Sequence, residues 1–284
     1  MEIAVISGKG GTGKSAVSAA FATLNEKVVL ADCDVDAANL YLIFSPLIQE
    51  EKVFISGQKA VMDKDICSNC GICMDYCRFD AITEINGEIL IDETSCDGCQ
   101  LCVRVCPVEA ISMIKEDKSR LFAGDFRNGK MVYGRLSPGE ENSGRLVDVV
   151  RDKAKKMAKA SDIDTIIIDG PPGIGCPVIS SVTGVDRVVV VTEPTLSGLH
   201  DLKRTLEVTS NFSIKTQVLV NKYDLNEKMT DNIEAYCGEK GIAVTGKIPF
   251  DPRVVEAMVH CKSIVEYAPD SEVAQVISKA FKLI

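Results

Sequence analysis

The sequence lacks any apolar run long enough to cross a membrane. Its longest runs, TIIIDG and RVVVVTEP, are far shorter than the ~20 residues that a transmembrane helix requires. The first residues, MEIAVISGKGG, also lack the basic stretch, the long apolar stretch and the cleavage site of an export signal. We therefore expect a soluble, cytoplasmic protein without a membrane partner.

Basic charge is also scarce. The chain has 32 Lys and Arg residues against 41 Asp and Glu residues, which gives a formal net charge of -9. Residues 62–116 hold eleven of the acidic residues and only four of the basic ones. This balance disfavours a general electrostatic surface for nucleic acid or anionic lipid, and we interpret the local basic run at 151–159 as the solvated face of a helix.

β-branched apolar runs recur along the chain. They occupy residues 2–7, 27–32, 164–170, 186–194 and 216–224, and helix-length amphipathic segments separate most of them. This alternation predicts an α/β fold with a doubly wound, mostly parallel sheet. In such a sheet the loops that follow the strands meet at one edge, where ligands bind.

The alternating pattern stops after residue 61 and resumes clearly near residue 143. We therefore expect one α/β domain made of residues 1–61 and 117–284, with a smaller domain inserted at 62–116. On the return path, Asn128 and Gly129 have the sequence of a tight hairpin turn.

The first loop has the sequence of a phosphate-binding loop. Residues 8–15 read GKGGTGKS, which matches G-x-x-x-x-G-K-[ST] between a predicted strand and a predicted helix. Glycines let backbone N–H groups surround phosphate oxygens, the lysine neutralises them, and the hydroxyl can ligate magnesium. The expected nucleotide-binding residues here are Gly8, Lys9, Gly10, Gly11, Thr12, Gly13, Lys14 and Ser15.

Eight of the twelve cysteines form two copies of one spacing, C-x-x-C-x-x-C-x-x-x-C, at residues 67–77 and 96–106. This is the pattern of two-cluster bacterial ferredoxins, in which the fourth cysteine of each run ligates the other 4Fe-4S cluster. One predicted set is Cys67, Cys70, Cys73 and Cys106, and the other is Cys96, Cys99, Cys102 and Cys77. Zinc bound by pairs of thiolates is the alternative interpretation. The insertion is thus expected to be an α+β ferredoxin domain in a reducing compartment.

The second lysine of the phosphate loop, Lys9, gives the chain a family resemblance. KGGTGKS resembles the deviant Walker A loop of the ATPase family that includes MinD, ParA, Mrp and the nitrogenase iron protein. The resemblance implies P-loop ATPase activity, slow without a partner, in a dimer that encloses ATP. It also implies that Lys9 and Lys14 are catalytic, with Lys9 acting on the nucleotide of the partner subunit. The alternative interpretation is that Lys9 is a solvated loop lysine without a catalytic role.

Two further segments resemble the switch regions of that family. VVLADCDVDAANL resembles switch I, which implies that Asp32 and Asp34 lie at the magnesium and the attacking water, with Asp34 positioning the water and Asn39 in support. TIIIDGPPG resembles Walker B and switch II, which implies that Asp169 holds magnesium through water and that residues 170–173 sense the γ-phosphate. The resemblance implies that the magnesium-site residues are Ser15, Asp32, Asp34 and Asp169.

The base of the nucleotide is left open by the sequence. LVNKYD resembles the family segment in which Asn221 contacts the base, but N-K-x-D is also the guanine-reading motif of GTPases, with Asp224 contacting the base. A strand-capping loop is a third interpretation. Because the phosphate loop is the two-lysine kind, we expect ATP rather than GTP.

Cys176 is a separate candidate. It follows the Walker B aspartate at the offset at which the nitrogenase iron protein has a cysteine that holds a bridging cluster, although that protein's other ligand cysteine has no counterpart here. A small buried side chain is the alternative. We expect structural roles for Cys33, Cys237 and Cys261, and no functional role for His200 or His260.

Taken together, the motifs resemble MinD-superfamily ATPases with an inserted ferredoxin domain. This resemblance implies an ATP-hydrolysing homodimer, or a heterodimer with a paralogue, that couples its nucleotide state to electron transfer or to metal or iron-sulfur cofactor assembly. Its cofactors would be ATP, Mg²⁺ and two 4Fe-4S clusters, and its partner a redox or metallocofactor protein. The alternatives are a positioning ATPase of the ParA or MinD kind with a redox-sensing insert, and a passive electron-transfer module with a nucleotide docking switch.

Overall fold

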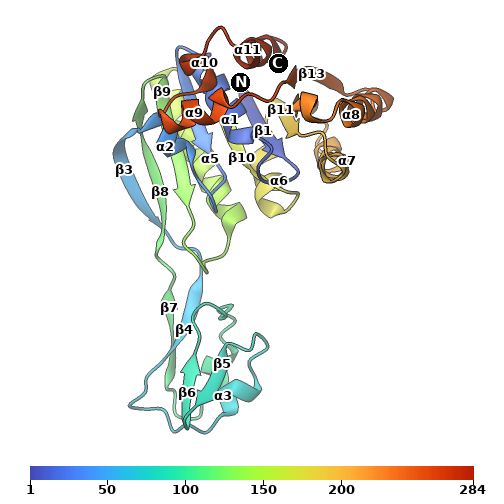
Figure 1. Cartoon of the computed structure of the whole chain (residues 1–284). Helices are drawn as coiled ribbons and strands as arrows, with labels where there is room; N and C mark the ends of the chain where they lie inside the picture. The colour runs from blue at the N-terminus through green and yellow to red at the C-terminus, as the bar shows by residue number, and fades with distance from the viewer. The chain divides into compact units, whose positions relative to one another are not determined.

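The computed structural model describes residues 1–284 and divides them into two compact units (Figure 1). The larger unit contains Met1–Glu51, Leu121–Arg135 and Ser143–Ile284. The smaller unit contains Lys52–Arg120 and Leu136–Asn142.

A nine-stranded sheet runs through the larger unit in the order β13-β12-β11-β1-β10-β2-β9-β8-β3. All six neighbouring pairs from β13 to β9 are parallel. The strands are β1 (Glu2–Ser7), β2 (Val28–Asp32), β3 (Leu47–Phe54), β8 (Ser119–Phe126), β9 (Gly129–Arg135), β10 (Ile166–Pro172), β11 (Arg187–Thr192), β12 (Lys215–Asn221) and β13 (Ala243–Ile248). The predicted large, mostly parallel sheet is confirmed.

Helices cover both faces of this sheet, because successive residues of its central strands are apolar and point to opposite faces. The helices are α1 (Lys14–Thr23), α2 (Leu40–Phe44), α5 (Ser143–Ser161), α6 (Cys176–Val182), α7 (Leu196–Ser210), α8 (Glu227–Glu239), α9 (Arg253–Val259), α10 (Ile264–Tyr267) and α11 (Glu272–Lys282), with a 3-10 turn η1 (Tyr223–Leu225).

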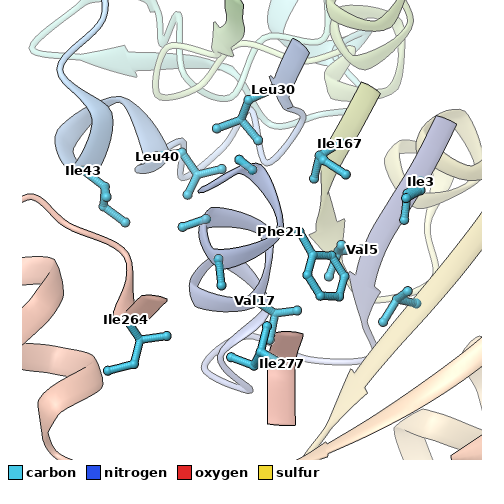
Figure 2. Packing of buried hydrophobic residues seen from close by; sticks show 14 of the residues in the cluster. Ile3, Val5, Val17, Phe21, Leu30, Leu40, Ile43, Ile167, Ile264 and Ile277 are labelled. Carbon is cyan, nitrogen blue, oxygen red and sulfur yellow. The ribbon is translucent and has the colours of Figure 1, made fainter. Parts of the chain in front are cut away.

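The core on one face gathers around α1. Figure 2 shows Val17 and Phe21 of α1 between residues of the sheet, such as Ile3 and Leu30, and Ile277 of α11. Phe21, Ile3 and Leu30 are completely buried. This packing fixes the start of α1, and therefore the loop that precedes it, against the ends of β1 and β10.

The sequence predicted five of the nine strands, at β1, β2, β10, β11 and β12, within a few residues of their observed bounds. It also predicted the hairpin between β8 and β9, which are neighbours in the sheet, but placed its turn at Asn128 and Gly129, one residue later than the observed turn at Arg127 and Asn128. It missed β3, β8, β9 and β13. β3 is mostly exposed along its length, so it lacks the continuous apolar pattern that marks a buried parallel strand.

The smaller unit contains two short two-stranded sheets and two short helices. β4 (Gln58–Met62) pairs antiparallel with β7 (Ile111–Lys115), and β5 (Ile82–Ile85) pairs antiparallel with β6 (Glu88–Ile91). α3 (Ile72–Asp75) carries Cys73, and α4 (Leu101–Val105) carries Cys102. Its apolar core is small and consists of Ala60, Cys73, Ile82, Ile89 and Ile111, with seven more cysteine and methionine side chains among those packed against it.

The smaller unit is longer than the insertion expected at 62–116. It begins at Lys52 because β4, which starts before residue 62, is the pairing partner of β7. It also includes Leu136–Asn142, which the sequence placed in the α/β domain, because Glu140 accepts hydrogen bonds from Ser56 and Ser119.

Candidate nucleotide site and cysteine-lined cavities

The phosphate loop lies between the end of β1 and the start of α1, as its sequence predicts. Gly13 precedes α1 with φ 91°, a conformation that favours glycine. A Cβ atom at Gly13 would also lie 2.2 Å from the amide nitrogen of Asn221. The last glycine of the loop is therefore required both by its backbone and by the close approach of the loop after β12.

Lys14 is the charged centre of this loop. Its Nζ atom lies 3.0 Å from Asp169 Oδ2 and 3.4 Å from Asp34 Oδ2. Burial alone would lower the pKa of Lys14, but the carboxylates of Asp169, Asp34 and Asp32 raise it above its usual value. The lysine is therefore held as a cation among carboxylates.

Two hydroxyl groups on α1 also donate hydrogen bonds to the carboxylate of Asp169. Ser15 Oγ donates to Asp169 Oδ2 at 2.8 Å, and Ser18 Oγ donates to Asp169 Oδ1 at 2.6 Å. Ser15 and Asp169, two residues predicted to lie at magnesium, are therefore in direct contact. Ser18 was not identified from the sequence, because it lies one turn beyond the motif.

Asp32 is completely buried at the end of β2, and its Cα is the register partner of Asp169 on β10. Its Oδ2 atom accepts from the backbone N–H groups of Asn39 and Leu40 at 3.1 Å each. Burial, with the nearby negative charge of Asp169, raises the pKa of Asp32 to about 7. Asp32 thus lies with Asp34 and Asp169 around one lysine, which leaves an excess of negative charge.

A cleft of about 610 Å³ opens over this group. It is lined by residues 10–16, by Asp34 and Asn39, and by Asn221 and Lys222. Its size falls within the ~300–1,000 Å³ of typical ligand pockets. Two buried side-chain oxygens in its lining, Thr12 Oγ1 and Asn39 Oδ1, have no hydrogen-bond partner within the protein, so both are available to a bound molecule.

One wall of the cleft is apolar and was not found from the sequence. It is formed by Phe250, Val254, Val255 and Met258, at and before α9. No phosphate or magnesium motif reaches this far along the chain, so the only available signal was the apolar spacing of a short helix.

The two predicted base-reading residues differ in their surroundings. Asn221 lines the cleft and donates to the carbonyl of Thr12 at 2.8 Å. Asp224 does not line the cleft, and its Oδ1 atom accepts from the backbone N–H of Phe250 at 2.7 Å.

Lys9 and Gly8 do not reach the cleft. Lys9 Nζ forms an ion pair with Glu193 at 2.6 Å and donates to Ser197 Oγ at 2.9 Å, both after β11. Gly8 packs so closely on α7 that a Cβ atom there would lie 2.6 Å from the Cβ of Asp201. The structure therefore places Lys9 away from the nucleotide cleft of its own chain.

The eight clustered cysteines line two small cavities in the smaller unit. One cavity is lined by Cys67, Cys70, Cys73 and Cys106, and the other by Cys77, Cys96, Cys99 and Cys102. Each cavity therefore brings together one of the two predicted sets, including the fourth cysteine that comes from the other run. Burial raises the pKa of Cys73, and the neighbouring charges of Cys106, Cys67 and Cys70 raise it further.

Backbone N–H groups point at some of these sulfur atoms. Ala110 N–H donates to Cys106 Sγ at 3.2 Å, Asn69 N–H to Cys67 Sγ at 3.4 Å, and Ala60 N–H to Cys96 Sγ at 3.5 Å. No group of three or more His, Cys, Asp or Glu side chains in the chain converges to hold a single metal ion.

The remaining cysteines are separate from these cavities. Cys33 and Cys237 are buried, as expected for structural residues, whereas Cys261 is exposed. Cys176 is exposed at the start of α6, so the interpretation of it as a small buried side chain is wrong. No helix of the structure is both long enough and apolar enough to span a membrane.

Comparisons with known proteins agree with this architecture. The chain is 41% identical over 230 residues to the uncharacterised protein MJ0578 of Methanocaldococcus jannaschii, covering 80% of this chain and 79% of that protein. A second protein of the same organism, MJ0579, is 29% identical over 94% of this chain and 92% of its own length. A shorter match, 26% identical over 41% of this chain and 40% of that protein, is to the cytosolic Fe-S cluster assembly factor NBP35 of Eremothecium gossypii.

Among solved structures, the septum site-determining protein MinD of Pyrococcus horikoshii, complexed with Mg-ADP, has a TM-score of 0.59 at 21% identity. The match covers 99% of this chain and 94% of that chain. The model of the CobQ/CobB/MinD/ParA nucleotide binding domain matches residues 3–264. The chain therefore belongs to the CobQ/CobB/MinD/ParA family of nucleotide-binding domains.

Proposed function

We propose that this protein is an ATP-hydrolysing dimer that couples its nucleotide state to electron transfer or to assembly of a metal or iron-sulfur cofactor. The observation that carries the proposal is that one chain holds both a phosphate-loop cleft and two cavities of four cysteines each. The cleft supplies a nucleotide switch, and the cysteines supply the redox or metal chemistry.

In the nucleotide cleft, Lys14 would bind the β- and γ-phosphates, and its present partners support this role. Lys14 is paired with Asp169 and Asp34. When a nucleotide binds, its phosphate oxygens can replace these carboxylates as partners of Lys14, and the carboxylates can then bind a magnesium ion. Asp34 lines the cleft, which suits it to orient the attacking water. Magnesium in such sites keeps several waters and takes ligands from the phosphates, so it does not require three convergent protein ligands.

ATP is the preferred nucleotide because Asp224 is already engaged. A guanine-reading aspartate must accept from the ring N–H and amino group of the base, whereas Asp224 accepts from the Phe250 backbone and lies outside the cleft lining. The apolar wall at Phe250 and Val254 provides a surface on which a purine ring can lie.

Dimer formation is part of the proposal because Lys9 has no role in its own cleft. It would leave Glu193 and act on the nucleotide of a partner subunit, as the phosphate-loop resemblance implies. The partner would be a second copy or a paralogue, and the presence of two similar proteins in one organism supports the second arrangement.

The two cysteine sets would hold two 4Fe-4S clusters. Each cavity has four thiols, and backbone N–H groups already point at the sulfur atoms of three of the cysteines, as is usual around such clusters. A four-iron cluster would take its four thiolates from around a cube rather than from one point. When bound, such clusters accept and release single electrons.

The small core of the smaller unit supports the same assignment. Its buried apolar residues are few for a unit of this length, and small domains with little core need disulfides or metals for stability. Its cysteines form no disulfides. Clusters bound to both sets would therefore contribute directly to the folding of this unit.

Two other functions follow from parts of the same architecture. The similarity of the fold to MinD supports a positioning ATPase with a redox-sensing insert. A passive electron-transfer module would use the cleft only as a docking switch. Cys176 remains a candidate ligand shared between subunits, since it is exposed next to the loop after β10.

We predict that Lys14→Ala weakens ATP binding by about 10- to 100-fold, the equivalent of about 1.5–3 kcal/mol for lost charge-assisted hydrogen bonds. Isothermal titration calorimetry of the full chain measures the effect. Lys27→Ala is the matched control because Lys27 is exposed and lies outside the cleft lining. Equal affinities of wild type and Lys14→Ala would contradict the assignment of the cleft.

We predict that metal-free wild type loses stability, relative to Asp32→Asn, as the pH rises between about 4 and about 7. The pKa of Asp32 is 3.8 as a model value and about 7 in the folded chain, so in this window the folded state holds a proton that the unfolded state has lost. Urea unfolding across this range measures the effect, and the exposed Asp36→Asn serves as control. Parallel stability curves for wild type and Asp32→Asn would show that Asp32 does not titrate in this way.

We predict that anaerobically purified protein contains about eight irons and that Cys99→Ser loses about half of them, because one of two four-iron clusters loses a ligand. Iron and sulfide analysis with EPR of the reduced protein measures the loss. Cys261→Ser should retain the full iron content, since Cys261 is an exposed cysteine outside both cavities. About two zinc ions and no iron would instead establish the zinc interpretation.

A further inference from the structure

The smaller unit contains a buried charged network that neither nucleotide binding nor cluster binding uses. Lys59 on β4 is 8% exposed, and Glu140 in the segment 136–142 is 9% exposed. Buried charges are costly unless they are paired and hydrogen-bonded, so their partners show what the network holds in place.

Glu140 fastens the segment 136–142 to the strands of the smaller unit. Its carboxylate accepts from Ser56 Oγ at 2.9 Å, from Lys118 N–H at 2.9 Å, and from both the backbone and the hydroxyl of Ser119. Burial would raise the pKa of Glu140, but these hydrogen bonds lower it below its usual value. Asn142 adds a hydrogen bond from its side chain to the carbonyl of Ser56.

Lys59 joins the same segment to the loop that carries the second cysteine set. Its Nζ atom pairs with Glu116 at 3.0 Å and donates to the carbonyl of Gly139 at 2.8 Å. It also donates to the carbonyl of Glu93, three residues before Cys96. One buried ammonium group therefore holds Gly139 and the approach to Cys96 together.

The neighbours of Lys59 on β4 contact that loop directly. Ala60 N–H donates to Cys96 Sγ at 3.5 Å. A Cβ atom at Gly98 would lie 2.2 Å from the carbonyl oxygen of Gln58, so the loop lies tightly on the backbone of β4. A displacement of Lys59 or of β4 would therefore change the position of Cys96.

The other end of the segment continues directly into α5, in the larger unit. α5 begins at Ser143, and its second residue, Gly144, lies against the start of α6, since a Cβ atom there would be 3.4 Å from the Cβ of Cys176. α6 follows the loop after β10, and the last two residues of β10, Pro171 and Pro172, line the nucleotide cleft. Asn142, which contacts Ser56, is therefore bonded directly to Ser143, the first residue of α5, and the start of α5 lies against α6.

We propose that residues 136–142 are a coupling strap through which the nucleotide state of the cleft repositions the loop of the second cysteine set, with Glu140 and Lys59 as positioning residues. This inference rests on the proposed function. The signal would run from the loop after β10 to α6 and α5, along the chain to Glu140 and Gly139, and through Lys59 to the loop at Glu93 and Cys96. The first cysteine set has no contact with Lys59 and would be affected less.

The test is hydrogen–deuterium exchange of the full chain with its metal loaded, with and without a non-hydrolysable MgATP analogue. If residues 136–142 act as a coupling strap, the analogue should change amide exchange several-fold at 136–142 and at 93–99, and change it little at 63–73. Nucleotide affinity is measured in the same samples by calorimetry. Absence of nucleotide binding overturns the proposed function and the strap together, whereas binding with unchanged exchange at 136–142 overturns the strap alone.

Glu140→Gln separates signal transmission from simple anchoring. It should bind the analogue with wild-type affinity but lose the exchange response at 93–99. Glu141→Gln is the matched control, because it makes the same chemical change at the adjacent, exposed position and should keep the response. Should Glu140→Gln fail to fold, Ser119→Ala removes a single donor to the same carboxylate and should reduce the response. An undiminished response at 93–99 in these variants would overturn the proposal.

Discussion

The parallel register of β10 between β1 and β2 is the constraint on which the nucleotide site depends. It sets Asp169 beside Val5, just before the phosphate loop, and opposite Asp32 at the end of β2. Because α1 begins at Lys14, within the phosphate-loop motif, Lys14 and Ser15 both contact the carboxylate of Asp169. Burial raises the pKa of Asp32, and the negative charge of Asp169 at the adjacent strand end raises it further.

The positions of the side chains around Lys14 were predictable where the motif fixes the backbone. Lys14, Ser15, Asp32, Asp34 and Asp169 all meet in the structure because each follows, or directly ends, a strand of the parallel sheet. The cysteine sets were predictable because the repeat matches the pattern of two-cluster ferredoxins, in which the fourth cysteine of each run joins the set of the other run.

Features that depend on distant pairing were not predictable. The apolar wall at Phe250 has no motif, because it is created by the return of a late segment beside the phosphate loop. The partners of Lys9 after β11 could not be read from its sequence neighbours either. The segment 136–142 belongs to the smaller unit only because a carboxylate at Glu140 finds four donors on residues far from it in sequence.

We propose that a nucleotide switch and an electron or metal carrier on one chain are energetically coupled. The most direct measurement is an anaerobic EPR redox titration of the protein with and without MgATP, with Lys14→Ala as control. We expect MgATP to shift the potential of at least one cluster by about 59 mV or more in wild type, the equivalent of about 1.4 kcal/mol for one electron, and not in the variant. Unchanged potentials in wild type that has bound MgATP would contradict it.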